Sequence, residues 1–166
     1  MTDLDAVIER HRKSGIAIDS NLLLLLVVGL VDQKLATRFK RTCIFAQEDF
    51  ELLKKLLARF EKRFVTPHVL TEVSNFIGQV ADPQRQLCRV QLAQFVKPSD
   101  EHHTPAKDLL EMTEYYTFGL TDASITDLAL RQLLVVTVDA PLAHYLSNKG
   151  LPAVNFNHVR AAAWRN

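Results

Sequence analysis

Cysteine, glycine and proline are scarce in this chain of 166 residues, which has two cysteines, five glycines and six prolines. Two cysteines make no disulfide framework, and neither belongs to a C-x-x-C pair. We therefore expect Cys43 and Cys88 to pack in the core of a protein from a reducing compartment, the cytoplasm. Internal repeats, low-complexity tracts and linkers are also missing, and the length suits one core. We predict a single domain over residues 1–166.

An excess of either charge is missing as well, because 20 lysines and arginines face 19 aspartates and glutamates, for a net charge of +1. A protein without a global basic field can attract nucleic acid only through a local patch. This balance argues mildly against a pure nucleic-acid-binding module, whose affinity usually depends on many clustered phosphate contacts.

The longest apolar run, Leu22–Val31, is too short to span a bilayer, which takes about 20 residues. The polar residues Asp19, Ser20 and Asn21 come directly before it. The N-terminal segment is acidic and then basic, and it lacks the apolar region of a secretory signal. We therefore expect no membrane association, and we interpret Leu22–Val31 as a buried helix.

Four short apolar segments, rich in branched or aromatic residues, are typical of strands that are covered on both faces. They are Gly15–Asp19, Phe64–Thr66, Leu133–Asp139 and Ala153–Phe156. Helical patterns lie between them, and strands that alternate with helices predict an α/β domain with a parallel sheet.

The helices are indicated by apolar spacing and by residues suited to helix starts. Gln47–Arg63 has apolar residues at a helical period. Thr66 can cap a helix that opens at Pro67. Thr121 can cap another helix, and Pro141 can open one more after the third predicted strand.

The segment Gln84–Glu114 is predicted to be helical, with one interruption at Lys97–Pro105. This interruption is polar, and we interpret it as a surface loop. It holds two adjacent histidines, His102 and His103, for which no partner spacing supports a zinc site.

Four carboxylates fall where a parallel sheet binds ligands. Because strand carboxyl ends and the following helix starts gather at one edge of such a sheet, we expect the four side chains to meet in one cleft. They are Asp19 and Asp139 at strand ends, Glu72 in the helix after the second strand, and Asp122 at a helix start.

Four clustered carboxylates require compensation of their charge. Two unit charges about 4 Å apart repel by roughly 4 kcal/mol at an effective dielectric constant near 20. Either some of the acids take up protons, or a divalent cation neutralises them. Ligation by oxygen alone, with no cysteine nearby, suits Mg²⁺ or Mn²⁺ better than zinc. Such ions can activate water and stabilise an in-line displacement at phosphorus.

Polar neighbours could orient these acids. Thr137 shares a strand face with Asp139, two residues later. The remaining candidates are Asn75, on the helix face of Glu72, Asn21 at the first strand-to-helix turn, and Thr121 beside Asp122.

A basic cluster is predicted on the helix Gln47–Arg63, on the face opposite its apolar stripe, and it could hold RNA phosphates. Its members are Lys55, Arg59, Lys62 and Arg63. A solvated helix face is the alternative, and it is the more frequent one for such a cluster.

Each acid has a simpler explanation when it is taken alone. Asp at a strand end or helix start often serves as a cap or turn residue, and a helical Glu is commonly solvated. The functional interpretation therefore rests on the set of four and its order. A phosphatase or phosphotransfer domain with Asp19 as nucleophile is a further alternative, although the usual pattern has a second Asp at the position of Asn21.

The acids and their flanking residues resemble the motifs of the PIN-domain nucleases. The resemblance covers roughly residues 15–160, and the motifs come in the family's order. They are IDSN (Ile18–Asn21), TPHVLTEVSN (Thr66–Asn75), GLTDASI (Gly119–Ile125), TVDAPLAHYL (Thr137–Leu146) and the closing strand LPAVNF (Leu151–Phe156).

This resemblance implies a three-layer α/β/α sandwich with a mainly parallel central sheet. It also implies a Mg²⁺- or Mn²⁺-dependent endoribonuclease that leaves a 5′-phosphate and a 3′-hydroxyl. The four acids match the family's acidic positions. Many members are toxins, so the expected partners are RNA and an antitoxin protein, and a homodimer stays open. The alternative is a catalytically inactive module of the same fold that binds RNA or serves in assembly.

Overall fold

The protein is described here by a computed structural model, which covers residues 3–163, so both ends of the predicted domain lie outside the described residues. Helices and short strands follow one another along the chain. The helices are α1 (Asp3–His11), α2 (Ser20–Val31), α3 (Gln33–Arg38), α4 (Gln47–Leu57), α5 (Pro67–Ile77), α6 (Gln84–Val96), α7 (Ala106–Leu109), α8 (Thr113–Phe118), α9 (Leu120–Leu130), α10 (Ala140–Asn148) and α11 (Phe156–Ala163). The strands are β1 (Ile16–Ile18), β2 (Phe64–Val65), β3 (Asp100–Glu101), β4 (Leu134–Thr137) and β5 (Ala153–Asn155).

All strand pairs are parallel. Three strands form one sheet in the order β1-β4-β5, and β2 pairs with β3 in a second sheet. A parallel bridge between Ile16 and Arg63 joins β1 to the chain just before β2. The strands therefore lie side by side in the order β3-β2-β1-β4-β5. The predicted α/β class with a parallel sheet is confirmed, and four of the strands lie within the predicted segments.

The strand order changes direction between β1 and β4. From β1 the chain continues to β2 and β3 on one side, whereas from β4 it continues to β5 on the other. Such a switch leaves a crevice at the carboxyl ends of parallel strands, and ligands commonly bind there. Asp19 directly follows β1, and Asp139 lies two residues after the end of β4.

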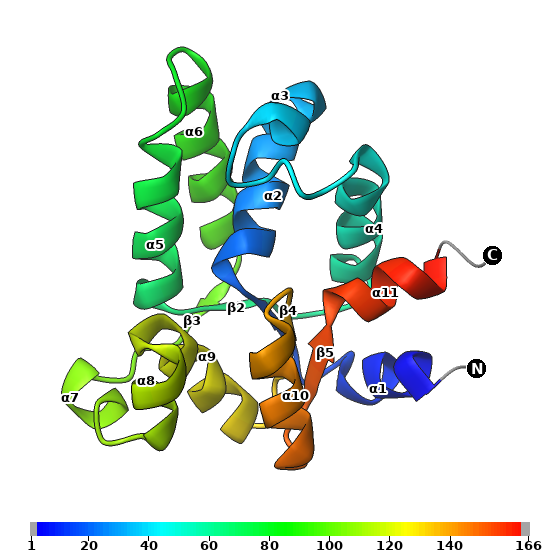
Figure 1. Cartoon of the computed structure of the whole chain (residues 1–166), viewed down its shortest axis with the longest axis vertical. Coiled ribbons are helices and arrows are strands. Elements are labelled where there is room, and N and C mark those ends of the chain that lie inside the picture. The colour runs from blue at the N-terminus through cyan, green and yellow to red at the C-terminus, as the bar shows by residue number, and fades with distance from the viewer. Residues whose placement is uncertain (1–2, 164–166) are drawn as a thin grey trace.

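α2 is buried along most of its length because it contacts α3, α4, α5 and α6. Figure 1 shows these helices gathered above the strands, with α7–α10 below them. Gly29 allows α4 to approach closely, since a Cβ at this position would lie 2.3 Å from the Phe50 ring. A helix that is apolar all round needs such surroundings, so the buried-helix prediction is confirmed.

Among residues 3–163, no helix has the length and apolar character needed to cross a membrane.

The predicted helix Gln47–Arg63 is too long, because α4 ends at Leu57. The apolar period continues through Phe60, which reaches the core from the turn after the helix and is 7% exposed. The predicted loop Lys97–Pro105 is wrong in part, since it contains β3, whose Asp100 pairs with Phe64.

Two local predictions are also wrong. Thr121 does not cap a helix, because α9 begins at Leu120 and Gly119 takes the cap position with φ of 94°. Cys43 is exposed, whereas Cys88 is buried as expected. Thr66 caps α5 as predicted, accepting the N–H of Val69.

Candidate functional site

Asp19 is held at the end of β1 by three hydrogen bonds. Its Oδ1 accepts the backbone N–H of Leu22 at 2.8 Å, so it caps α2. Its Oδ2 accepts the Thr137 hydroxyl at 2.5 Å and the backbone N–H of Val138 at 2.8 Å. The side chain is buried, and these three are the hydrogen bonds that reach its oxygens from the described part of the chain.

The pKa of Asp19 is raised because burial disfavours the charged carboxylate. The hydrogen bonds from Thr137, Leu22 and Val138 oppose this shift, and the charge of Asp139 adds to it. The hydrogen bonds therefore fix the carboxyl group in position, while burial favours its protonated, neutral form.

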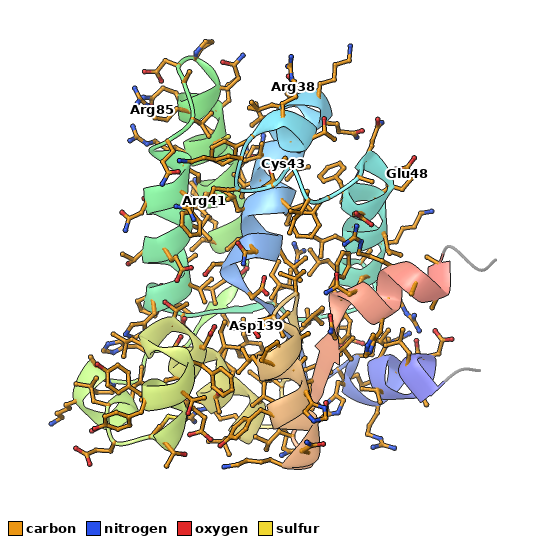
Figure 2. The ribbon with its side chains drawn as sticks, in the orientation of Figure 1. Arg38, Arg41, Cys43, Glu48, Arg85 and Asp139 are labelled. Carbon is orange, nitrogen blue, oxygen red and sulfur yellow. The ribbon has the colours of Figure 1, made fainter. Side chains whose placement is uncertain are left out.

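Asp139 lies across the strand switch and caps α10. Its Oδ1 accepts the N–H of Leu142 at 2.9 Å, while its own N–H donates to the Thr137 hydroxyl at 2.9 Å. Figure 2 shows Asp139 near the centre of the molecule, below α2 and at the start of α10. Thr137 thus joins the two strand-end acids, because its hydroxyl donates to Asp19 and accepts from the backbone N–H of Asp139. Its supporting role in a functional site stays a prediction.

Asp122 and Glu72 come from α9 and α5, which pack against each other. The hydroxyls of Thr66 and Ser124 are 2.9 Å apart and tie the starts of these helices together. The pKa of Asp122 is raised to about 7, first because of burial and then because of the charges of Asp139, Asp19 and Glu72. The other three predicted acids thus lie within electrostatic reach of Asp122.

Helix starts offset part of this negative charge. α2 begins at Asp19, α10 begins at Asp139, and Asp122 lies in the first turn of α9. The N-terminus of a helix carries a partial positive charge of about half a unit. Asp19 and Asp139 are therefore helix caps, which is the simpler explanation for an Asp at a helix start, and they also belong to the cluster.

The four carboxylates supply only oxygen ligands, which suit Mg²⁺ or Mn²⁺. Burial is the main cause of the raised pKa of Asp122, and the three neighbouring charges that add to it are ones that a cation would offset. With the side chains as they stand, no group of three or more His, Cys, Asp or Glu among the described residues is close enough to hold a metal ion. Ion binding therefore requires the carboxylates to move closer together.

The other predicted supporting residues lie around the cluster without bonding to Asp19. Asn21 is exposed in the first turn of α2, and Asn75 is exposed on α5. Thr121 is partly buried within α9, and its carbonyl accepts the Ser124 hydroxyl at 2.6 Å.

The predicted basic helix face does not form. Only Lys55 lies in α4, whereas Arg59, Lys62 and Arg63 follow its end. Arg59 is bound by Asp5 at 3.2 Å and Glu9 at 2.7 Å of α1. RNA binding by these residues stays a prediction, but a shared helix face cannot be its basis.

A polar network on α9 was not predicted from the sequence. Asp127 Oδ2 accepts the Thr104 hydroxyl at 2.7 Å and lies 2.9 Å from His102 Nε2. Arg131 contacts the same oxygen. The parallel pairing of β2 with β3 places His102 beside Asp127 of α9. Because β3 has only two residues and both are exposed, its sequence has no apolar pattern from which this position could be predicted.

No protein-family model matches the chain, and no curated protein matches it. Inferences about its function therefore rest on the residues of the cluster and their geometry.

Proposed function

We propose that this protein is a metal-dependent ribonuclease of the PIN type, which hydrolyses RNA phosphodiester bonds at Asp19, Glu72, Asp122 and Asp139 with Mg²⁺ or Mn²⁺. One observation carries the proposal. The pKa of Asp122 is raised to about 7, with the other three acids among the causes, at the carboxyl edge of a parallel sheet. Helices that alternate with the strands of a parallel sheet fit the α/β class of this proposal.

The acids divide the work according to their surroundings. Asp19 would be the fixed ligand, because three hydrogen bonds hold it in place. Asp122 on α9 and Glu72 on α5 would complete the set of ligands. Asp139 completes the site directly or through water. A bound Mg²⁺ or Mn²⁺ would supply an activated water and stabilise charge at phosphorus.

The raised pKa of Asp122 also bears on metal binding. A carboxyl group with a pKa of about 7 carries a proton about half of the time at neutral pH. It must lose this proton to bind a cation, so metal affinity falls as the pH is lowered below 7. Repulsion from the other carboxylates adds to the rise that burial causes, and a doubly charged ion would offset more of this repulsion than a singly charged one.

Cleavage of a mixed-sequence single-stranded RNA, with Mg²⁺ or Mn²⁺ added, tests the proposal. We expect Asp19→Asn and Asp122→Asn to lower the rate by at least about a hundredfold, since each removes a ligand charge. Asp108→Asn, an exposed aspartate of α7 outside the cluster, is the matched control. Cleavage that survives both EDTA and Asp19→Asn would overturn the proposal. RNA binding without cleavage, unchanged in Asp122→Ala, would point instead to an inactive RNA-binding module.

A toxin role belongs to the same proposal, with an antitoxin protein as the partner. Expression of an active ribonuclease of this kind should arrest bacterial growth, and Asp122→Asn should remove the arrest. Equal growth arrest by the unchanged chain and by Asp122→Asn would contradict the toxin role. The cleavage assay would still test the ribonuclease activity separately.

A further inference from the structure

A pocket of about 450 Å³ opens beside Glu72, between α5 and the start of α9. His68, Thr71, Glu72 and Asn75 of α5 line one wall, and Thr121 lines the other. Volumes of about 300 to 1,000 Å³ are typical of pockets that hold small ligands. The pocket therefore offers room for one small group directly beside the carboxylate cluster.

The wall on α5 is a single helical stripe. His68, Glu72 and Asn75 follow one another at intervals of three or four residues, with Thr71 beside them, so their side chains share one face. Thr71 and Asn75 are exposed there. Because Thr66 and Ser124 tie the two helices together at 2.9 Å, the two walls keep their spacing.

The lining favours a neutral group over a phosphate. It contains one carboxylate and no lysine or arginine among the described residues. The pKa of His68 is lowered, because burial and then the nearby His103 disfavour the protonated ring. A phosphate in this pocket would meet the charge of Glu72 with no protein cation to offset it.

The remaining surfaces suit a flat molecule with hydrogen-bonding edges. Pro67 and Leu120 add apolar surface to the lining, and Thr71 and Asn75 add donors and acceptors. His68 Nδ1 is buried and has no hydrogen-bond partner among the described residues. Proteins that read single-stranded RNA stack its bases on flat side chains and bond to their edges.

We propose that this pocket between α5 and α9 is a nucleobase subsite, which selects the base next to the phosphodiester bond held at the carboxylate cluster. The inference rests on the proposed ribonuclease function and adds to it a place where the sequence of the RNA is read. A base can enter only when its edge is free of a pairing partner. Asn75 is the principal selecting residue, because its amide offers a donor and an acceptor side by side.

Binding is measured with the full chain carrying Asp122→Asn, so that cleavage does not consume the probe. Short labelled oligomers of adenylate, cytidylate and uridylate are titrated, and fluorescence anisotropy gives each Kd. Asn75→Ala and Thr71→Ala are then added singly. Ser74→Ala is the matched control, because Ser74 is exposed on the same helix but outside the pocket lining. In parallel, the bases beside each cut made by the otherwise unchanged chain are read by sequencing.

We expect Asn75→Ala to weaken binding of the preferred oligomer by roughly two- to tenfold, the worth of one hydrogen bond, and to reduce the difference between oligomers. Ser74→Ala should change neither quantity. Three results would overturn the subsite: Asn75→Ala weakens the binding of all oligomers equally, it binds them with the same affinities as Ser74→Ala, or no oligomer binds at all. If the chain binds with base preference but never cleaves RNA, the nuclease proposal fails and the subsite stands. If the chain cleaves RNA with a base preference that Asn75→Ala leaves unchanged, the subsite fails and the nuclease proposal stands.

Discussion

Thr137 donates its hydroxyl proton to Oδ2 of Asp19 across 118 positions of the sequence. The same hydroxyl oxygen accepts the backbone N–H of Asp139. One buried side chain therefore links the acid at the end of β1 to the acid that follows β4. The register that places Ile18 opposite Val136 is what allows this contact.

Replacing Thr137 by Val should lower the free energy of unfolding by about 1.5–3 kcal/mol, because a buried carboxylate loses a hydrogen-bond donor. Urea denaturation measures the change. Thr137→Ser keeps the hydroxyl and should retain most of the stability. Equal stability of the Val and Ser variants would contradict the role assigned to this hydroxyl.

The acid cluster should make the protein more stable at mildly acidic pH. The pKa of Asp122 is raised from 3.8 to about 7, and that of Asp19 is raised as well. Between these values the folded state binds more protons than the unfolded state, so the free energy of unfolding falls as the pH rises from about 4 to 7. One pKa unit corresponds to about 1.4 kcal/mol, before the reduction that partial exposure brings.

Denaturation curves collected at pH 5 and pH 7.5, without divalent ions, measure this difference. Asp122→Asn removes the main titrating group and should flatten the dependence. The pKa values of Glu114 and Asp127 are lowered, so these carboxylates add little above pH 5. The pKa of His68 is lowered too, and this opposes the trend, because the unfolded chain binds more protons at this histidine than the folded chain does. The comparison with Asp122→Asn therefore isolates the contribution of the acid. A pH dependence that is the same in Asp122→Asn and in the unchanged chain would contradict the assignment.

Divalent cations should stabilise the folded chain, because they bind the cluster in the folded state only. An ion at a hundred times its Kd adds about 2.7 kcal/mol to the free energy of unfolding. Thermal melting with Mg²⁺ or Mn²⁺, compared with sodium chloride at equal ionic strength, measures the gain in Tm. The gain should disappear in Asp122→Ala and persist in Asp108→Ala. A gain of the same size in both variants would place the ion elsewhere.

Replacing Gly29 by Ala should destabilise the protein by about 1–3 kcal/mol, since the added methyl group would overlap the Phe50 ring in a packed core. Urea denaturation again reports the change. Leu30→Ala, at the exposed neighbouring position on α2, should have a smaller effect. If Gly29→Ala is as stable as the unchanged chain, α2 and α4 do not pack as closely as described.

The placement of Asp19 and Asp139 at one edge of the sheet could be predicted from the sequence, because it depends on where two parallel strands end. Asp19 and Asp139 follow buried, β-branched segments, and parallel pairing does the rest. The contact between Thr137 and Asp19 could not be predicted, since spacing along one strand says nothing about register with another. β3 was missed because two exposed, charged residues carry no apolar pattern. The end of α4 was missed because Phe60 continues the helical period from outside the helix.

The pairing of β1 with β4 also sets the time at which the cluster can first exist during synthesis. A chain still on the ribosome exposes Asp19 and Glu72 long before residues 134–139 have been added. Until then Asp19 lacks both partners of its Oδ2, and no crevice has formed beside it. A chain that stops before residue 134 therefore lacks Asp139 and both Oδ2 partners of Asp19, so the cluster cannot assemble in it.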